Sequence, residues 1–517
     1  MSIKQRWTIL DSQRSTILDR ARDCAALTLP HILPPRDHTE DMRLPIPWQA
    51  HGSACVRNLA GRVSTTLFPP NLPFFKFGLA EYLKSSDPEF ETAWDSIRDA
   101  LRVVERSVTT FFDTHSWRIA TVDAAEALIC VGNTMLHRGD DDRMRTVRYD
   151  RYVVKRDAMG SPYEIIVRET KCFTTLPKEI QDAIMPPIKK LGKTPDERLP
   201  VDIYTHVQLN GDDGHWYQTQ EVMDVPWEGG SGHWPTDDCP WIPLRFTALG
   251  GEDYGRGLVE LTIGDWRSLE SFYIDLAEIA AAMAKIIPLV NPAGMTSIRD
   301  ITRAASGTPI PGRADDVTFV NINKLSDVQF MLTMSERIEQ RLGRAFLLYS
   351  SIQRQGERVT AEEIKLMAKE LEQAFGGTYT LLAEDWQLRI AKLAMASLRR
   401  DPKFPKLSPE LKPQVITGIA GLGKDAEMAS MDEFLGRSRL IDPQSALIDA
   451  PKILRKAADA AGLIPSDVVK TDEILQAEQE AAQAAQAQAS MGPEVVKGLM
   501  DPNNPMNQPT VEGVTPQ

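Results

Sequence analysis

The segment 326–400 constrains the fold most strongly, because it holds two amphipathic helical patterns separated by a short polar loop. The second pattern has a well-defined start, since Thr360 is placed to cap a helix and Glu363 completes a capping box. Apolar residues then recur every three or four positions to the end of the segment. About forty helical residues predict a rod on the order of 60 Å long, which Gly376 and Gly377 invite to kink. So long a helix in a chain of this size usually supports an assembly.

The sequence before this segment predicts a partner for its first helix. Residues 263–288 carry another amphipathic helical stripe, and Pro288 ends it. Residues 289–325 are rich in Gly and Pro and contain one strand-like run, DVTFVNIN, before the helix at 326–348. A helix, a small insert and a returning helix predict a hairpin of two rods with a separate subdomain at its tip.

The first half of the chain changes its pattern at about residue 145. Residues 1–130 are mostly of helical character. In 145–250, β-branched and aromatic runs separated by turns predict two β-hairpins, the second turning at Asn210 and Gly211. We therefore expect an α+β domain that ends at about residue 262.

Composition limits the classes of function. A chain of 517 residues is long enough for about three domains, and 42% hydrophobic with 25% charged residues is ordinary for a soluble globular protein. The net charge of −13 argues against tight DNA binding, which needs basic patches. Five widely spaced cysteines without a CxxC pair indicate reduced thiols. The most apolar stretch, 277–290, is broken by Lys285 and Pro288, so we expect no membrane span.

The motif GIAGLGKD at 418–425 is the strongest sign of an enzyme. It fits GxxxxGK, the phosphate-binding loop of nucleotide hydrolases. Such a loop needs a Ser or Thr hydroxyl after the lysine to hold Mg²⁺, whereas Asp425 places a carboxylate there. A glycine-rich turn is the favoured interpretation. The alternative is a P-loop-type DNA packaging ATPase that uses 418–425, and an assay of ATP turnover separates the two.

Other candidate sites have simpler explanations. His51 and Cys55 lie four positions apart on a predicted helix, but no further ligands complete a metal site, so a packed histidine and thiol are favoured. Four tryptophans in a turn-rich stretch are placed to stack on a sugar or base, although a role in a β-domain core or subunit interface is favoured. They are Trp216, Trp227, Trp234 and Trp241. We predict no catalytic residue, no cofactor and no metal.

The polar loop at 349–358 is the remaining candidate site. Gln353, Arg354, Gln355 and Arg358 are polar or basic side chains within it. From the residues alone, a solvated turn between two helices is favoured over a binding site.

Several segments resemble, in the same order, the head-to-tail connector or portal protein of short-tailed, podovirus-type bacteriophages. The longest is LYSSIQRQGERVTAEEIKLMAKELEQAFGGTYTLLAEDWQLRI at 348–390. The others are PWQAHGSACVRNLAGRVSTTLFP at 47–69, YVVKRDAMG at 152–160, VDIYTHV at 201–207, GEDYGRG at 251–257, GDWRSLE at 264–270 and LVNPAG at 289–294. The resemblance covers residues 1 to about 425.

The resemblance implies a mainly α fold with an α+β wing domain, long stem and tunnel helices, a small α/β clip and a helical crown. The implied parts are a wing at 1–262 with a β-rich region at 145–250, stem helices at 263–288 and 326–348, a clip at 289–325, a tunnel loop at 349–358, a long wing helix at 359–400, a crown at 401–465, and a short Ala/Gln-rich helix with a disordered tail at 466–517.

The resemblance also implies a function without catalysis. Portal proteins form a ring of twelve at one capsid vertex, a channel for packaging and ejection of double-stranded DNA. The implied partners are further copies of the chain, DNA held non-specifically, terminase, tail or adaptor proteins, and major capsid and scaffolding proteins, with no membrane. The implied location is the portal vertex of the virion, after assembly in the host cytoplasm.

Within such a ring, Gln353, Arg354, Gln355 and Arg358 would line the narrowest part of the channel, and an acidic lumen would let DNA slide without sticking. A further alternative is a monomeric or dimeric helical scaffold, which ring formation would exclude.

Overall fold

The computed structural model describes residues 1–70, 73–75, 77, 88–190, 199–284, 287–320, 325–349, 361–400, 402, 404 and 454. Contacts divide the chain into two compact units. The first comprises 1–85 and 103–422, and the second comprises 86–102 and 423–517. Almost all described residues belong to the first unit. In the second unit they are the first part of helix α4 and Leu454.

The N-terminal part of the chain is helical, as the sequence predicted. Its helices are α1 (Ile3–Gln13), α2 (Ser15–Leu27), α3 (His51–Leu67), α4 (Pro88–Thr114) and α5 (Trp117–Val131). Helix α3 packs on α5, and both bury apolar side chains such as Leu59 and Leu128 in the largest hydrophobic core. This core also receives residues from the strands and from the C-terminal helices.

A five-stranded antiparallel sheet confirms both predicted hairpins. Its strands, in spatial order, are β3 (Tyr152–Arg156), β4 (Pro162–Cys172), β5 (Pro200–Asn210), β6 (His215–Val222) and β7 (Val225–Pro235). The predicted two-residue turn at Asn210 and Gly211 is wrong in detail. Asn210 pairs with His215, so the loop has four residues, and the left-handed position is Gly214, with φ of 66°.

Successive side chains along each strand point to opposite faces of this sheet, and both faces are covered by apolar residues. Ile165 and Val167 of β4 belong to the largest core, whereas Ile166 between them packs with Trp7 and Leu10 of α1 on the other face. Helix α6 (Lys178–Lys190), which the sequence did not predict, forms a third cluster with residues of β5 and β6.

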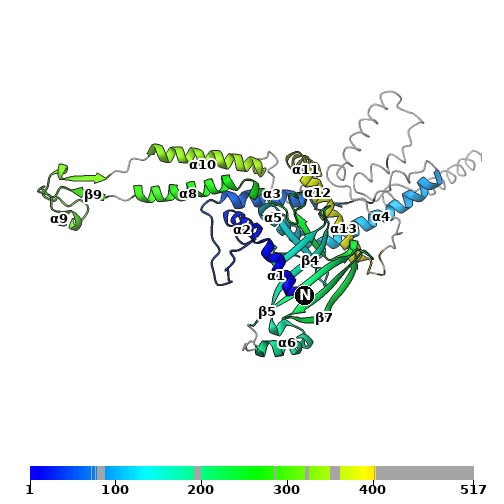
Figure 1. Ribbon diagram of the computed structural model, residues 1–517. Helices are drawn as coiled ribbons and strands as arrows, with labels where there is room; N and C mark the ends of the chain where they lie inside the picture. Colours follow the sequence, from blue (N-terminus) through cyan, green and yellow to red (C-terminus); the bar gives the residue numbers. More distant parts are fainter. Residues whose placement is uncertain are drawn as a thin grey trace, which may run out of the picture. The chain divides into compact units, whose positions relative to one another are not determined.

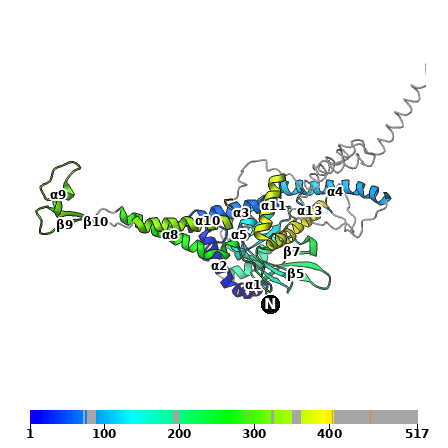
Figure 2. The same cartoon turned by 90° about the horizontal axis from the view of Figure 1, so that it is seen from above.

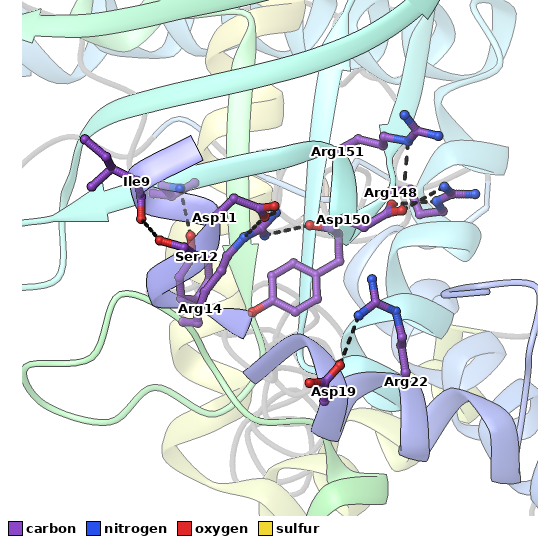
Figure 3. A network of polar contacts seen from close by, with 12 residues as sticks. Ile9, Asp11, Ser12, Arg14, Asp19, Arg22, Arg148, Asp150 and Arg151 are labelled. Atoms are coloured by element: carbon purple, nitrogen blue, oxygen red, sulfur yellow. Dashed lines mark hydrogen bonds and ion pairs between the residues drawn. The ribbon is translucent and has the colours of Figure 1, made fainter. Parts of the chain in front are cut away.

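A buried arginine joins the two N-terminal helices to the strands. Arg14 lies at the bend between α1 and α2, is 1% exposed, and donates to Asp11 and to the carbonyl of Tyr149 (Figure 3). Its guanidinium lies 5.4 to 5.7 Å from the ring centroids of Tyr149, Trp7 and Tyr254. These hydrogen bonds and aromatic faces compensate the cost of removing the charge from water.

The remaining strands and short helices complete the framework. A three-stranded antiparallel sheet has the order β2 (Met144–Val147), β1 (Asn133–Arg138) and β8 (Trp241–Arg245). Short helical turns are η2 (Tyr149–Arg151), η3 (Phe173–Thr175), η4 (Thr236–Asp238), η5 (Ala314–Asp316) and α7 (Leu258–Leu261).

The predicted hairpin of rods is present. Its helices are α8 (Ile263–Met283) and α10 (Leu325–Ala345), which lie side by side in both views (Figures 1 and 2). Between them lies the insert, defined as residues 287–320, with β9 (Ile287–Val290), α9 (Ile298–Arg303) and β10 (Val317–Val320). The sequence predicted a strand at β10 but none at β9, and it ended the preceding helix at Pro288. Pro288 sits inside β9, which pairs with β10.

The predicted single helix over 359–400 is wrong. The chain forms α11 (Ala361–Phe375), α12 (Gly377–Leu382), a π-helical turn η6 (Ala383–Leu388) and α13 (Arg389–Leu398). Gly376 has a positive φ of 45°, which interrupts the helical hydrogen bonding. The break lets Phe375 pack against Phe246 and Trp386 against Phe68. The predicted crown at 401–465 and tail at 466–517 lie almost wholly outside the described residues.

The described residues are mainly helical with β sheets, in agreement with the coarse fold class. The division into wing, stem, clip and crown stays a prediction.

A buried carboxylate on the five-stranded sheet gives a test by pH. Glu164 accepts hydrogen bonds from Arg6 of α1 (3.0 and 2.7 Å) and from His206 Nε2 of β5 (3.1 Å). Burial alone would raise the pKa of Glu164, but the bonds from His206 and Arg6 lower it from 4.5 to about 2. Glu164 therefore stabilises the folded chain above pH 4.5, and this contribution is lost as the pH falls toward 2.

We expect Glu164→Gln to have a lower thermal unfolding midpoint than the wild type at pH 7, and the difference to shrink as the pH falls below 4.5. Circular dichroism of both proteins between pH 7 and 3 measures this. Glu228→Gln, at an exposed position on β7, is the control and should follow the wild type throughout. A difference between Glu164→Gln and the wild type that does not depend on pH would contradict the linkage.

Candidate functional site

Polar bonds set the register of the hairpin formed by α8 and α10. Arg341 of α10 pairs with both carboxylate oxygens of Asp265 on α8, with its Nε at 2.7 Å from Oδ2. The Tyr273 hydroxyl donates to Glu339 Oε1 at 2.6 Å, and this bond, together with burial, raises the pKa of Tyr273 to about 12. The two pairs join neighbouring positions of α10 to positions about two turns apart on α8, so they hold the two helices together over this part of the hairpin.

The base of the hairpin is fixed by a buried aromatic contact. Trp266 of α8 and Phe346, just after α10, are fully buried, with ring centroids 5.5 Å apart at 75°. His51 at the start of α3 lies beside Trp266, and its Nε2 donates to the carbonyl of Glu339 at 3.1 Å. Leu269 and Leu342 complete the buried layer. The hairpin is therefore anchored to the helical core at this end.

The far half of the hairpin has no such cover. No residue of α8 after Leu269 is buried, over the whole length of that helix to Met283. On α10, Phe330 is 65% and Leu332 is 45% exposed. Apolar side chains therefore lie open to water on a structure that is only two helices thick.

Contacts at the end of α10 determine the direction in which the chain enters the polar loop. Leu347 has a left-handed φ of 53°, which costs a residue with a Cβ about 1–2 kcal/mol. The Leu348 amide donates to the Gly343 carbonyl at 2.7 Å, and Tyr349 folds back so closely that a Cβ on Gly343 would overlap its ring. Asn58 Nδ2 of α3 donates to the Leu347 carbonyl at 3.2 Å. These contacts turn the chain sharply at the point where the loop begins.

The insert is organised around one carboxylate. Asp316 Oδ2 accepts from the Met295 amide at 3.0 Å and from the Thr296 amide and hydroxyl at 3.3 and 3.0 Å. Gly294 passes so close that a Cβ there would lie 2.5 Å from Asp316 Cγ. The side chains of Met295 and Ile298 are exposed, so the insert presents apolar surface to solvent.

The predicted loop residues Gln353, Arg354, Gln355 and Arg358 lie outside the described residues, which end at Tyr349 before the loop. Their role stays a prediction. The motif at 418–425 also lies outside the described residues.

The weaker candidate sites have structural roles. His51 bonds a backbone carbonyl, and Cys55 is buried, which raises the pKa of its thiol to about 12. Trp216 and Trp241 are buried, and Trp234 and Trp227 pack against hydrophobic clusters, as the favoured interpretation held. Within the described ranges, no group of three or more potential metal ligands occurs. In the same part of the chain, no helix is long and apolar enough to span a membrane.

Sequence reasoning missed the residues that shape the start of the loop. Leu347 carries no signal for a left-handed conformation, because glycine or asparagine is the usual residue there. Asn58 lies far from the loop in sequence, so its bond depends on tertiary packing. Gly343, an isolated glycine in a helical pattern, was the one available sign of a close contact.

Sequence comparison assigns the family. The family described as bacteriophage head to tail connecting protein matches residues 1–469. The portal protein of Enterobacteria phage T3 is 33% identical over 492 residues, covering 93% of this chain and 90% of the relative. The portal protein of Escherichia phage T7 is 31% identical, covering 92% and 89%. That of Pseudomonas phage phiKMV is 30% identical, covering 95% and 96%. The chain belongs to this family, and its function is that of a portal connecting phage head and tail.

Solved structures similar to this chain include the necks of gene transfer agent particles. The neck of an empty particle has a TM-score of 0.35 and 12% identity, covering 71% of this chain and 91% of the other. The neck of a native particle has a TM-score of 0.32 and 11% identity, covering 78% and 99%. These TM-scores are low, so the family assignment rests on the sequence relatives.

The loop geometry yields a prediction for Asn58→Ala. Loss of the donor frees the carbonyl of Leu347, and one neutral hydrogen bond contributes about 1 kcal/mol. We expect amide hydrogen exchange at 346–349 to become roughly fivefold to tenfold faster. Exchange measured by mass spectrometry on the folded protein checks this. Ser53→Ala is the matched control, because Ser53 is a half-buried position on the same helix whose hydroxyl bonds to Ala50 at the start of that helix. Equal exchange in wild type and Asn58→Ala would show that Asn58 does not hold the turn.

Proposed function

We propose that the chain assembles as a ring of twelve at one vertex of the capsid, and that double-stranded DNA passes non-specifically through its channel during packaging and ejection. Membership of the connector family supports this proposal. The net charge of −13 supports a lumen that repels phosphates and lets DNA slide. The protein would be part of the virion, assembled in the host cytoplasm.

In this proposal α8 and α10 are the stem and 289–325 is the clip. The wing comprises 1–262 and the helical region 359–400, the tunnel loop is 349–358, and the crown is 401–465. The other partners are terminase, tail or adaptor proteins, and the major capsid and scaffolding proteins. The named relatives are portal proteins, a structural class, which favours a role without catalysis.

The observation that carries the proposal is the uncovered far half of the hairpin. Two helices cover only one side of each other, so the opposite sides need a third layer. Phe330 and Leu332 expose apolar surface there, and Asp275 and Glu278 of α8 have no ion partner among the described residues. A ring supplies the missing layer, because each hairpin then lies between two others through a head-to-tail interface.

Electron microscopy of the purified full-length chain tests the ring. We expect particles with a central channel. Uniform small particles from folded protein, with or without scaffolding protein, would contradict the proposal.

Phe330→Asp tests the stem interface. The side chain is exposed in a single copy, so the substitution should leave the circular dichroism spectrum and thermal midpoint unchanged. Burying the new carboxylate between copies is costly, so we expect few or no rings by microscopy and light scattering. Gln329→Asp adds the same charge at an adjacent exposed polar position and is the control. Normal rings from Phe330→Asp would exclude this residue from the interface.

The loop prediction concerns Arg354 and Arg358. A ring of guanidinium groups would contact passing phosphates weakly, since attraction is screened beyond roughly 8 to 10 Å. We expect Arg354→Ala and Arg358→Ala to assemble normally but to change the amount of DNA packaged or retained. Nuclease-protected DNA per particle measures the effect. Wild-type amounts in both variants would remove the loop from the mechanism.

A further inference from the structure

The segment Arg43–Leu44–Pro45–Ile46–Pro47–Trp48, here called the arm, displays two large apolar side chains to solvent. Ile46 is 85% exposed and Trp48 is 62% exposed. The arm precedes α3 and belongs to neither a helix nor a strand. Single exposed apolar residues are common, but a large aliphatic residue and a tryptophan two positions apart make a compact apolar surface.

Two prolines restrict the backbone of the arm, and hydrogen bonds fix its end. Pro45 and Pro47 fix their own φ angles, and each restricts the residue before it to extended conformations. At its end, the amide of Trp48 donates to Glu270 Oε1 of α8 at 2.8 Å. The next residue, Gln49, is buried and donates through Nε2 to the carbonyl of Leu27 at 2.6 Å. A surface fixed in this way loses little conformational entropy when it binds a partner.

Glu270 locates the arm on α8. Asp265 and Tyr273 of this helix bond to α10, whereas Glu270 between them bonds to the arm. The end of the arm, at Trp48, therefore lies against α8. It is level with the part of α10 that holds Arg341 and Glu339, the partners of Asp265 and Tyr273.

At this level α10 exposes a stripe of three arginines, Arg337, Arg341 and Arg344, at helical spacings of four and three. Arg341 is bound by Asp265. Arg337 and Arg344 have no carboxylate partner within the described part of the chain. The arm on α8 and the arginine stripe on α10 are thus two uncovered surfaces, at similar heights, on different helices of one hairpin.

We propose that the arm of one copy packs on α10 of the next copy, with Trp48 over the guanidinium groups of the arginine stripe. The inference rests on the proposed ring, in which the α8 side of each hairpin meets the α10 side of its neighbour. Tryptophan is the best aromatic partner for a cation, and arginine is its commonest cation. The binding partner of the arm is therefore a second copy of this chain, because that copy carries the complementary arginine stripe at the matching level.

Photo-crosslinking of full-length rings tests the contact. A benzoylphenylalanine at position 46 should give crosslinked dimers and higher multiples, with peptides mapping to α10. Mixing isotopically labelled and unlabelled chains distinguishes crosslinks between copies from those within one copy. The same crosslinker at Met159, an exposed position in the turn between β3 and β4, is the control. Rings with crosslinks only within one chain, or only to an added capsid or scaffolding protein, would overturn the proposal.

Substitutions test the chemistry. Two variants are compared: Trp48→Ser, and a double variant that carries Arg337→Gln and Arg344→Gln. We expect each to raise the protein concentration at which rings dissociate upon dilution by about tenfold, whereas Trp48→Phe should retain part of the contact. The two changes together should cost little more than either alone, because they remove the same contact. Met42→Ser, in the same loop, is the matched control.

The outcomes separate this inference from the ring itself. If the wild type and all controls fail to form rings, both proposals fall. If rings form and Trp48→Ser rings dissociate like the wild type, without crosslinks between copies from position 46, only the arm contact is wrong.

Discussion

The edge-to-face contact between Trp266 and Phe346 is the constraint on which the hairpin depends. Both rings are fully buried, and Trp266 Nε1 donates to Thr262 Oγ1 at 3.0 Å, so the indole is fixed at both its apolar and its polar side. Beyond this layer α8 has no buried residue. The hairpin is consequently held at one end only, and the direction in which it leaves the helical core is set by this pair and by His51 beside it.

The surfaces assigned to assembly are those that a single copy leaves uncovered. Phe330 lies on the far half of α10, while Trp48 lies on the arm beside α8. Neither position contributes to the core of one chain, so neither is explained by the stability of a monomer. Placed on different helices of the same hairpin, they suit a head-to-tail interface, in which the two surfaces that meet are different.

The sequence was most informative where periodicity alone decides structure. The stripes of 263–288 and 326–348 correspond to α8 and α10, and alternation in 145–250 corresponds to the five-stranded sheet. Gly376 signalled a kink, but its positive φ and the separation of α11 from α12 depend on how Phe375 and Trp386 pack. The left-handed Leu347 could not be predicted, because it is imposed by Gly343, Tyr349 and Asn58 together. Likewise, no local pattern joins Trp48 to Glu270.

The contacts within the insert close shorter loops than the contacts between the two helices. Asp316 binds Met295 and Thr296, which are 21 and 20 residues away, whereas Tyr273 and Glu339 are 66 residues apart. Each later pair along the hairpin, first Tyr273 with Glu339 and then Asp265 with Arg341, extends a structure already formed. Contacts that close shorter loops cost less conformational entropy, which favours their earlier formation. The hairpin is therefore suited to form progressively from its far tip toward Trp266. The end that attaches it to the helical core would then form last.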